Sequence, residues 1–395
     1  MQVPWTAPRR LRRVRETADL PVAVRLLLVN QFGVNVGFYL LVPYLATHLT
    51  GDLRMSVAAT AIVLGVRNLA QQGLFIIGGT AADRLGARRV IIAGCGLRAA
   101  GFGLFAFGDG LAVLVAAAVL SGLAGALFNP AVRAYIAVEA PDRARAFALF
   151  NVFAQAGALC GPVLGAVLLL ADFRVVAVTA ALIFLVLTVA QALVLPARDV
   201  PPSGTSLLGD WRACLADRRF LGFALALSGM YALQNQLYLV LPLEAERTTG
   251  RPEAVAAVFV ISTVVTLVLQ VPITRFLDRR RGGAIAGGMA VMGLGFLAPA
   301  LLPGPVPVLV AVLALAVGVM MAQPFVYDVV GSSGGPSRSG TYFGMFYMVS
   351  GVVAAVSTVV IGWAGPRGPL VCAAIGLTCA AGAAAHARRR APEPS

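Results

Sequence analysis

Apolar stretches of about twenty residues recur along the whole chain, and this repetition limits what the chain can fold into. A hydrocarbon core about 30 Å thick requires roughly 20 apolar residues in a helix. Of the 395 residues, 59% are hydrophobic and only 12% are charged, whereas a soluble domain carries about 25% charged residues. A helix satisfies its own backbone hydrogen bonds inside lipid. The sequence therefore predicts an all-α membrane protein with lipid as its surroundings.

We expect about twelve transmembrane helices in two sets of six. The first set is predicted at residues 23–45, 56–78, 90–108, 111–132, 147–170 and 175–195, and the second at 220–243, 254–274, 284–302, 306–329, 341–363 and 369–387. A polar, proline-containing segment separates the two sets. We expect an N-terminal half at 1–195, a cytoplasmic linker at 196–219 and a C-terminal half at 220–395.

Basic residues are distributed unevenly between the two predicted sides of the membrane. The chain has no lysine, and of its 31 arginines 24 lie in the termini and loops of one side and five in the loops of the other. Short cytoplasmic loops carry an excess of arginine. The distribution predicts a bacterial inner-membrane protein with both termini in the cytoplasm. It also explains the net charge of +14, so we expect no nucleic-acid partner.

The two halves repeat each other weakly. Four sets of residues recur in the same order at offsets of 194 to 199 residues: Asp83-Arg84 and Asp278-Arg279, Asn129-Pro130 and Gln323-Pro324, Arg143 with Phe147 and Arg338 with Tyr342, Tyr39 with Pro43 and Tyr238 with Pro242. Parallel repeats about an axis along the membrane normal are typical of secondary transporters, whose substrate site lies near the midplane between the halves.

The loop between the second and third predicted spans reads GTAADRLGARR and contains Gly79, Asp83, Arg84, Gly86, Arg88 and Arg89. Glycine permits a tight turn, and Asp83 can pair with an arginine or face a helix N-terminus. A bond that forms in one conformation and breaks in another would act as a conformational lock. Asp278 and Arg279 are the matching candidates in the second half.

The fifth span contains Gly157, Gly161, Pro162 and Gly165. Glycines at four-residue intervals let a second helix approach closely, and a proline removes one backbone hydrogen bond and allows a bend. Taken alone, this pattern predicts close helix packing with a kink.

Together these motifs resemble those of the major facilitator superfamily. The loop around Asp83 is similar to the family's loop 2–3 motif, and the glycine–proline pattern is similar to that of its drug:proton antiporter branch. Four further segments look like the MdtH-type multidrug exporters: Leu64 to Arg67, Gln71 to Leu74, Arg98 to Phe102 and Ser121 to Leu123. The resemblance implies a six-plus-six fold, export, and an Asp83 that faces the eleventh helix in the outward-facing state. Ala118 stands where many proton-coupled members have arginine, and the first span has no acid. The residues that usually couple transport to protons are therefore absent from these two positions, and the identity of the proton-binding group stays open.

Ionisable groups inside a membrane are costly, so each is a functional candidate. Three lie reasonably deep within the predicted spans: Arg67, Arg98 and Asp328, the last towards the inner end of its span. Asp328 is a candidate proton-binding group, or an acid at the membrane interface that caps the cytoplasmic end of its helix. Arg67 could instead bind carbonyl groups or Gln71, and Arg98 could serve a structural gate.

Polar and aromatic residues on the spans that line the cavity of such transporters are the substrate-contact candidates. They are Asn30, Asn35, Tyr39, Gln71, Asn129, Asn151, Gln155, Tyr231, Gln234, Asn235, Tyr238, Gln270, Gln323, Tyr327 and Tyr347. Amides and phenols among aromatic walls suit amphipathic organic compounds. Sugars also use amides, and each residue could instead form a helix–helix hydrogen bond.

Three functions stay open: a proton-driven exporter of drugs or secondary metabolites, an importer or facilitator of a small polar nutrient, and a non-transporting membrane sensor or scaffold. A scaffold has no need of a conformational lock, so transport is favoured. The chain lacks a phosphate-binding loop with lysine, and we expect no enzymatic activity. We expect no metal or other cofactor, a proton gradient as the energy source, and a monomer whose partners are lipid, protons and a small-molecule substrate.

Overall fold

The protein is helical throughout the part that the computed structural model describes, residues 20–196, 206–251, 253–278, 281–335 and 337–388. Helices of the first half are α2 (Val22–Thr47), α3 (Val57–Gly73), α4 (Phe75–Leu85), α5 (Ala87–Phe107), α6 (Leu111–Glu139), α7 (Arg143–Leu169) and α8 (Phe173–Val194). Those that follow are α9 (Leu207–Ala216), α10 (Arg218–Gln234), α11 (Val240–Thr249), α12 (Glu253–Leu277), α13 (Arg281–Leu301), α14 (Pro305–Ser332), α15 (Ser339–Trp363) and α16 (Gly368–Arg388). The arginine cluster at residues 9–15 lies outside the described residues.

Ten of the described helices are long and apolar enough to cross a membrane. The two remaining predicted spans are each divided. Residues 56–78 fall on α3 and α4, which are joined at Leu74, where φ is −106° and ψ is 7°. Residues 220–243 fall on α10 and α11, which are joined by a short 3₁₀ helix, Asn235–Tyr238. The Gln236 amide donates to the Ala232 carbonyl oxygen at this break (2.8 Å), so a side chain competes for a backbone acceptor.

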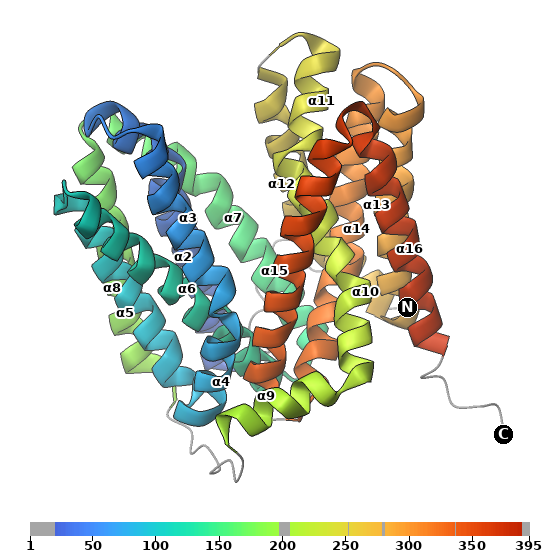
Figure 1. The fold of residues 1–395 in the computed structure, drawn as a ribbon. Coiled ribbons are helices and arrows are strands. Elements are labelled where there is room, and N and C mark those ends of the chain that lie inside the picture. Colours follow the sequence, from blue (N-terminus) through green and yellow to red (C-terminus); the bar gives the residue numbers. More distant parts are fainter. Residues whose placement is uncertain (1–19, 197–205, 252, 279–280, 336, 389–395) are drawn as a thin grey trace, which may run out of the picture.

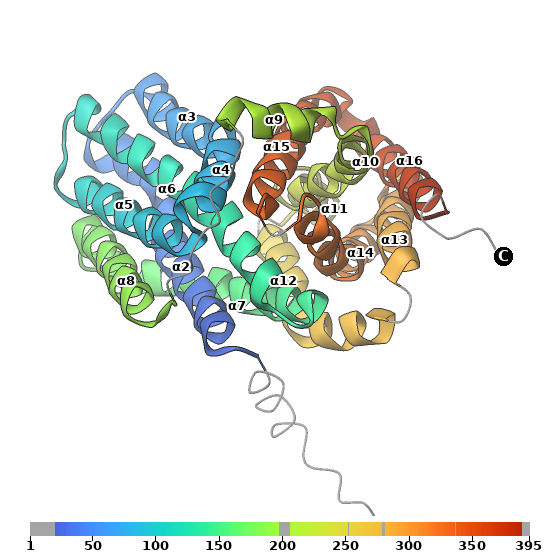
Figure 2. The same ribbon diagram turned by 90° about the horizontal axis from the view of Figure 1, so that it is seen from below.

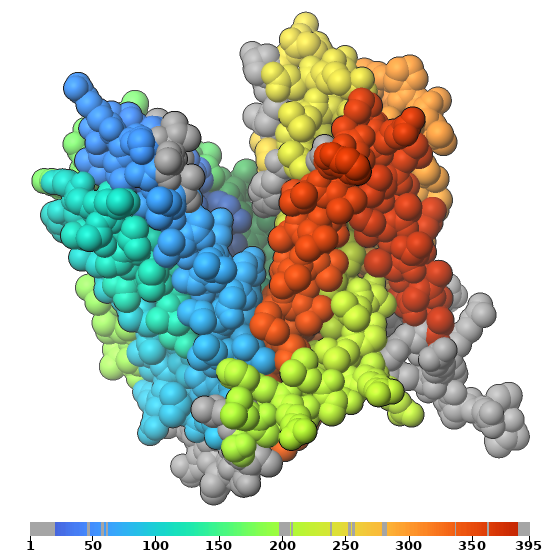
Figure 3. All heavy atoms as spheres, in the orientation of Figure 1, coloured from blue at the N-terminus to red at the C-terminus, as the bar shows by residue number. Residues whose placement is uncertain are grey.

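The helices form two bundles, α2 to α8 and α10 to α16, which meet at one end of the molecule and separate toward the other (Figures 1 and 2). We call the end that carries α9 the closed end and the end that carries α11 the open end. A space-filling view shows a wide cleft between the bundles that enters from the open end (Figure 3). Large apolar side chains on the outer helix faces, such as Leu193 and Trp363, are exposed, as a lipid-facing surface requires.

One predicted span ends too early. The fourth span is predicted to end at residue 132, which places Arg133 in a loop, but α6 continues to Glu139. The apolar pattern resumes after Arg133 with Ala134, Tyr135 and Ile136, which are all buried. Arg133 therefore lies inside a helix that packs in the membrane domain.

Candidate functional site

The carboxylate of Asp83, near the end of α4, lies at the N-terminus of α15 in the other bundle. Its Oδ1 accepts from the backbone N–H of Gly340 (2.7 Å), and its Oδ2 accepts from the N–H (2.6 Å) and the hydroxyl (2.7 Å) of Thr341. The first N–H groups of a helix have no partner within it, and the helix dipole favours an anion there. Asp83 thus supplies a cap to a helix that belongs to the opposite half.

Glycines allow the two helices to come this close. A Cβ on Gly79 would collide with the carbonyl oxygen of Gly340. A Cβ on Gly340 would collide with the carbonyl oxygen of Gly79 and would lie 2.7 Å from Oδ1 of Asp83. One turn further along α15, a Cβ on Gly344 would lie 2.8 Å from Cα of Ile76. The contact between α4 and α15 is therefore backbone against backbone, and it tolerates no side chain at these three positions.

The linker helix α9 is joined to both bundles at the closed end. Asp210 of α9 is buried and accepts from Arg84 of α4 (2.6 Å), and its other oxygen lies 3.2 Å from Nε of Arg338, which precedes α15. The neighbouring indole of Trp211 donates to the Thr80 hydroxyl on α4 (2.8 Å). The linker helix therefore adds a buried acid that contacts one arginine from each half.

Cys214, one turn after Asp210 on α9, is fully buried at this contact. Burial, followed by the negative charges of Asp217 and Asp83, raises the pKa of its thiol to about 12. The thiolate is the reactive form of cysteine. The Cys214 thiol should therefore react with a maleimide only when the closed end separates.

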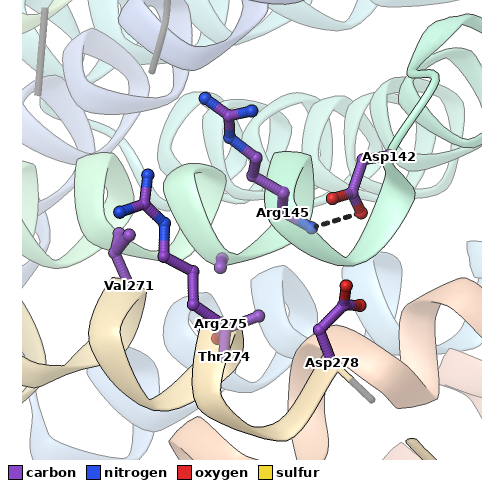
Figure 4. Close-up of a pocket in the computed structure, with 7 residues that line it drawn as sticks. Asp142, Arg145, Val271, Thr274, Arg275 and Asp278 are labelled. Carbon is purple, nitrogen blue, oxygen red and sulfur yellow. Dashed lines mark hydrogen bonds between the residues drawn. The ribbon is translucent and has the colours of Figure 1, made fainter. Parts of the chain in front are cut away.

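The matching region of the other half is built differently (Figure 4). A cavity of about 90 Å³ lies between α7 and the end of α12, and Asp142, Arg145, Arg275 and Asp278 line it. Here the N-terminus of α7 is capped by its own Asp142, which accepts from the N–H of Arg145 (3.1 Å). Asp278 lines the same cavity. Arg279 lies outside the described residues.

Two further polar contacts connect the bundles. Asn151 of α7 donates to the amide oxygen of Gln270 on α12 (2.7 Å), and Nη1 of Arg143 on α7 lies 3.9 Å from Oδ1 of Asp328 on α14. Asp328 is partly exposed and lies one turn from the end of α14. It is thus an acid between helices near the closed end.

An aromatic layer closes the bottom of the cleft. Phe147 of α7, Tyr327 of α14 and Phe343 of α15 are buried and pack edge to face, with ring centroids 5.3 to 6.2 Å apart. Phe147 and Phe343 each lie four residues from the start of their helix, about 6 Å along the axis at 1.5 Å per residue. Rings from both halves therefore close the passage just inside the closed end.

Arg133 of α6 lies among rings of both halves. Its guanidinium carbon is 5.0 Å from the ring centroids of Phe150 and Tyr347 and 5.2 Å from that of Tyr327, and its Nη1 donates to the carbonyl oxygen of Asn129 (3.0 Å). The Tyr231 and Tyr327 hydroxyls are hydrogen-bonded at 2.9 Å. Sequence reasoning missed Arg133, although the apolar run through residue 138 would have placed it inside the helix.

Arg67 and Arg98 are buried together within the first bundle. Both guanidinium groups lie over the ring of Phe38, at 5.2 and 5.5 Å. Arg67 donates to Asn68 (2.7 Å) instead of Gln71, and Arg98 also lies over Phe184 of α8. The Gln71 amide and the Arg98 guanidinium occupy the space beside Gly125 that a Cβ would fill.

The glycine–proline pattern of α7 packs within its own half. A Cβ on Gly157 would meet Asn35 at 2.8 Å, one on Gly161 would meet Tyr39 at 2.8 Å, and one on Gly165 would collide with α2 as well. The Tyr44 hydroxyl donates to the Pro162 carbonyl oxygen (2.6 Å). All three glycines therefore bring α7 against α2, the packing that the pattern alone predicts.

The remaining candidates are distributed between the cleft and the helix interfaces. Asn30 does not face the cleft: it is buried, and its oxygen accepts from Gln191 of α8 (2.6 Å). Asn35 donates to the Ala154 carbonyl oxygen (2.7 Å). Gly86 forms the turn between α4 and α5 with φ of 88°, and Arg88 donates to the Ala192 carbonyl oxygen (2.6 Å). Four candidates are partly or fully exposed: Arg89, Gln155, Gln234 and Asn235. Gln323 is buried, and the side chain of Tyr238 lies outside the described set.

Comparison with known proteins agrees with this architecture. The Major Facilitator Superfamily model matches residues 27–358. An uncharacterized MFS-type transporter of Mycobacterium tuberculosis is 42% identical over 354 residues, 86% of this chain and 84% of that protein. The multidrug resistance protein MdtH of Salmonella typhi is 30% identical over 341 residues, 85% of each chain.

Among solved structures, the transporter FucP in its outward conformation has a TM-score of 0.78 over 94% of this chain and 99% of that one. At 17% identity this likeness concerns the fold alone. The likeness agrees with the pair of helix bundles described above. The chain belongs to the Major Facilitator Superfamily and is a multi-pass membrane transporter rather than an enzyme.

Proposed function

We propose that the protein is a secondary active exporter of amphipathic small molecules in the bacterial inner membrane, and that the conformation described here faces outward. The observation that carries this proposal is the contact of Asp83 with α15, which joins the halves at one end of an open cleft. Halves held at one end and apart at the other represent one state of an alternating-access cycle. The opposite state requires this contact to break.

The distribution of arginine supports the orientation. At the closed end lie Arg84, Arg88, Arg89, Arg143, Arg145, Arg212, Arg218, Arg219, Arg275 and Arg338, whereas Arg54, Arg174, Arg247, Arg251 and Arg367 belong to the open end. By the positive-inside rule the closed end is the cytoplasmic end. The first described helix, α2, begins at this end and the last, α16, ends there, which supports the proposal that both termini are cytoplasmic.

Two rigid halves and a linker describe the motion. We infer that residues 1–195 and 220–395 move as units and that 196–219 connects them on the cytoplasmic side. Within this scheme, the hydrogen bonds of Asp83 and the ion pairs of Asp210 stabilise the outward-facing state. The 30% identity to MdtH and the glycine–proline pattern of α7 support export over import.

A susceptibility panel in a pump-deficient bacterial host tests export directly. Cells that produce the protein should resist several amphipathic compounds, and a protonophore should remove this resistance. The matched control is the Asp83→Ala variant at equal abundance in the membrane. Uptake of a small nutrient, with no gain of resistance to any compound, would contradict the proposal.

We further propose a proton gradient as the energy source, with Asp328 as the coupling group. Protonation of Asp328 would remove the negative charge that Arg143 faces in the other half. The contact between the halves at the closed end would then be weaker, as the cycle requires. In proteoliposomes, Asp328→Asn should abolish efflux driven by a pH gradient while exchange of substrate across the membrane continues. Unchanged gradient-driven efflux in this variant would eliminate Asp328 as the coupling group.

A further inference from the structure

Three arginines inside the membrane domain have no described acid in contact with them. Among the described residues, Arg67, Arg98 and Arg133 lie well inside their helices, whereas Asp83, Glu244 and Asp328 lie near helix ends. No described carboxylate lies within 4.0 Å of the nitrogens of these three arginines. A cation inside a membrane protein is costly unless it is paired, so a missing anionic partner needs a physical account.

Arg133 is the one of the three that lies between the halves. It is partly exposed, while Phe147 and Phe343, nearer the closed end, are at most 1% exposed. The buried rings of Phe147 and Phe343 therefore lie between Arg133 and the closed end. Phe150 and Tyr347, which flank its guanidinium group, lie about one helical turn further from the closed end than that layer.

Two donors at this place have no acceptor in the described structure. Nε of Arg133 is buried without a hydrogen-bond partner, and so is the hydroxyl of Tyr347, a residue that is only 8% exposed. A buried polar group without a hydrogen-bond partner destabilises the structure that contains it. The arginine comes from the first half and the tyrosine from the second, so one acceptor that satisfied both would join the halves.

We propose, on the basis of the export function above, that the transported compounds are aromatic organic anions whose acidic group is bound by Arg133 and Tyr347 at the bottom of the cleft. A carboxylate or sulfonate offers several lone pairs to the guanidinium and the phenol, and charge-assisted hydrogen bonds are the strong ones. The surrounding rings of Phe150, Tyr231 and Tyr327 suit an aromatic body. An organic cation at the same place meets repulsion from Arg133 and, within the first bundle, from Arg67 and Arg98.

A series of ligands with one ring system separates charge from hydrophobicity. Binding of 1-naphthoate, 1-naphthalenemethanol and 1-naphthylmethylammonium to the purified full-length protein is measured by calorimetry. The wild type should bind the carboxylate at least about tenfold more tightly than the alcohol and bind the ammonium most weakly. Arg133→Gln should reduce naphthoate affinity by about 10- to 100-fold, consistent with loss of a hydrogen bond between charged groups, and leave the alcohol within about threefold.

Two further variants keep the test independent of folding. Tyr347→Phe removes only the unpaired hydroxyl and should weaken naphthoate binding about fivefold without an effect on the alcohol. Arg174→Gln, on α8 at the open end, removes the same charge away from the cleft and should bind all three ligands as the wild type does. Wild-type binding of the ammonium as tight as that of the carboxylate overturns the proposal, and so does naphthoate binding unaffected by Arg133→Gln.

The failure of this inference differs from a failure of export. If cells that produce the wild type and cells that produce the Arg133→Gln variant resist cationic compounds equally, the anion site is wrong and export stands. If the wild type confers no resistance and expels none of the three naphthalene compounds from loaded proteoliposomes, export itself is wrong.

Discussion

Replacing Asp83 by alanine should reduce transport at least about tenfold and shift the protein away from the outward-facing state. The variant loses three hydrogen bonds between the halves, two of them to backbone N–H groups at the start of α15. Hydrogen bonds to charged groups contribute about 1.5–3 kcal/mol each, and an anion at a helix N-terminus about 0.3–1 kcal/mol. With about 1.4 kcal/mol per factor of ten, the population of the outward-facing state should fall about 100-fold or more.

Transport in proteoliposomes and maleimide labelling of Cys214 measure this effect together. Cys214 is buried at the closed end, so its labelling, followed by mass spectrometry of its peptide, should be slow in the wild type and fast in Asp83→Ala. Asp172→Ala is the matched control because Asp172 caps α8 within one half, accepting from the N–H of Arg174 (2.6 Å). Normal transport by Asp83→Ala, with Cys214 still protected, would show that the carboxylate does not hold the halves together.

Gly340→Ala should have an effect of similar size through a steric cause. A Cβ at this position would collide with the Gly79 carbonyl oxygen and lie 2.7 Å from Oδ1 of Asp83. Alanine favours a helix over glycine by about 1 kcal/mol, so α15 itself is not weakened, but α4 and α15 must separate. Transport should fall at least about tenfold while each bundle stays folded.

The control for this variant is Gly103→Ala on α5, because a Cβ there meets nothing within 4 Å. It should transport like the wild type at equal abundance. Since Asp83 and Gly340 are in contact, their substitutions should not be additive, and the double variant should transport about as poorly as either single variant. Gly340→Ala with wild-type transport would show that the close approach of α4 and α15 is not needed.

Local patterns were enough for most of the helices and for the family. The apolar runs and the arginine distribution give the spans, and the motif around Asp83 identified the loop that the structure places against α15. The pattern Gly157 to Gly165 likewise gave a close helix contact, although its partner α2 could not be read from the sequence. These features depend on residues near one another in the chain.

Features that depend on distant residues were missed. Arg133 was assigned to a loop because a charge ended the apolar run, and its aromatic neighbours come from α7, α14 and α15. Asp210 lies in a segment that reads as a polar linker, and its two arginines lie 126 and 128 residues away in sequence. Asn30 was assigned to the cleft because polarity alone does not tell which face of α2 meets α8.

Distances between spin labels on the two halves test the central claim, that the halves rock about a closed end held by Asp83. One pair, at Leu170 and Trp363, reports on the open end, and another, at Leu85 and Phe276, on the closed end; all four side chains are exposed. Both distances are measured by double electron–electron resonance. In the Asp83→Ala variant, the distance at the open end should be shorter and the distance at the closed end longer than in the parent protein. Two distances that stay unchanged, or that change in the same direction, would contradict the account.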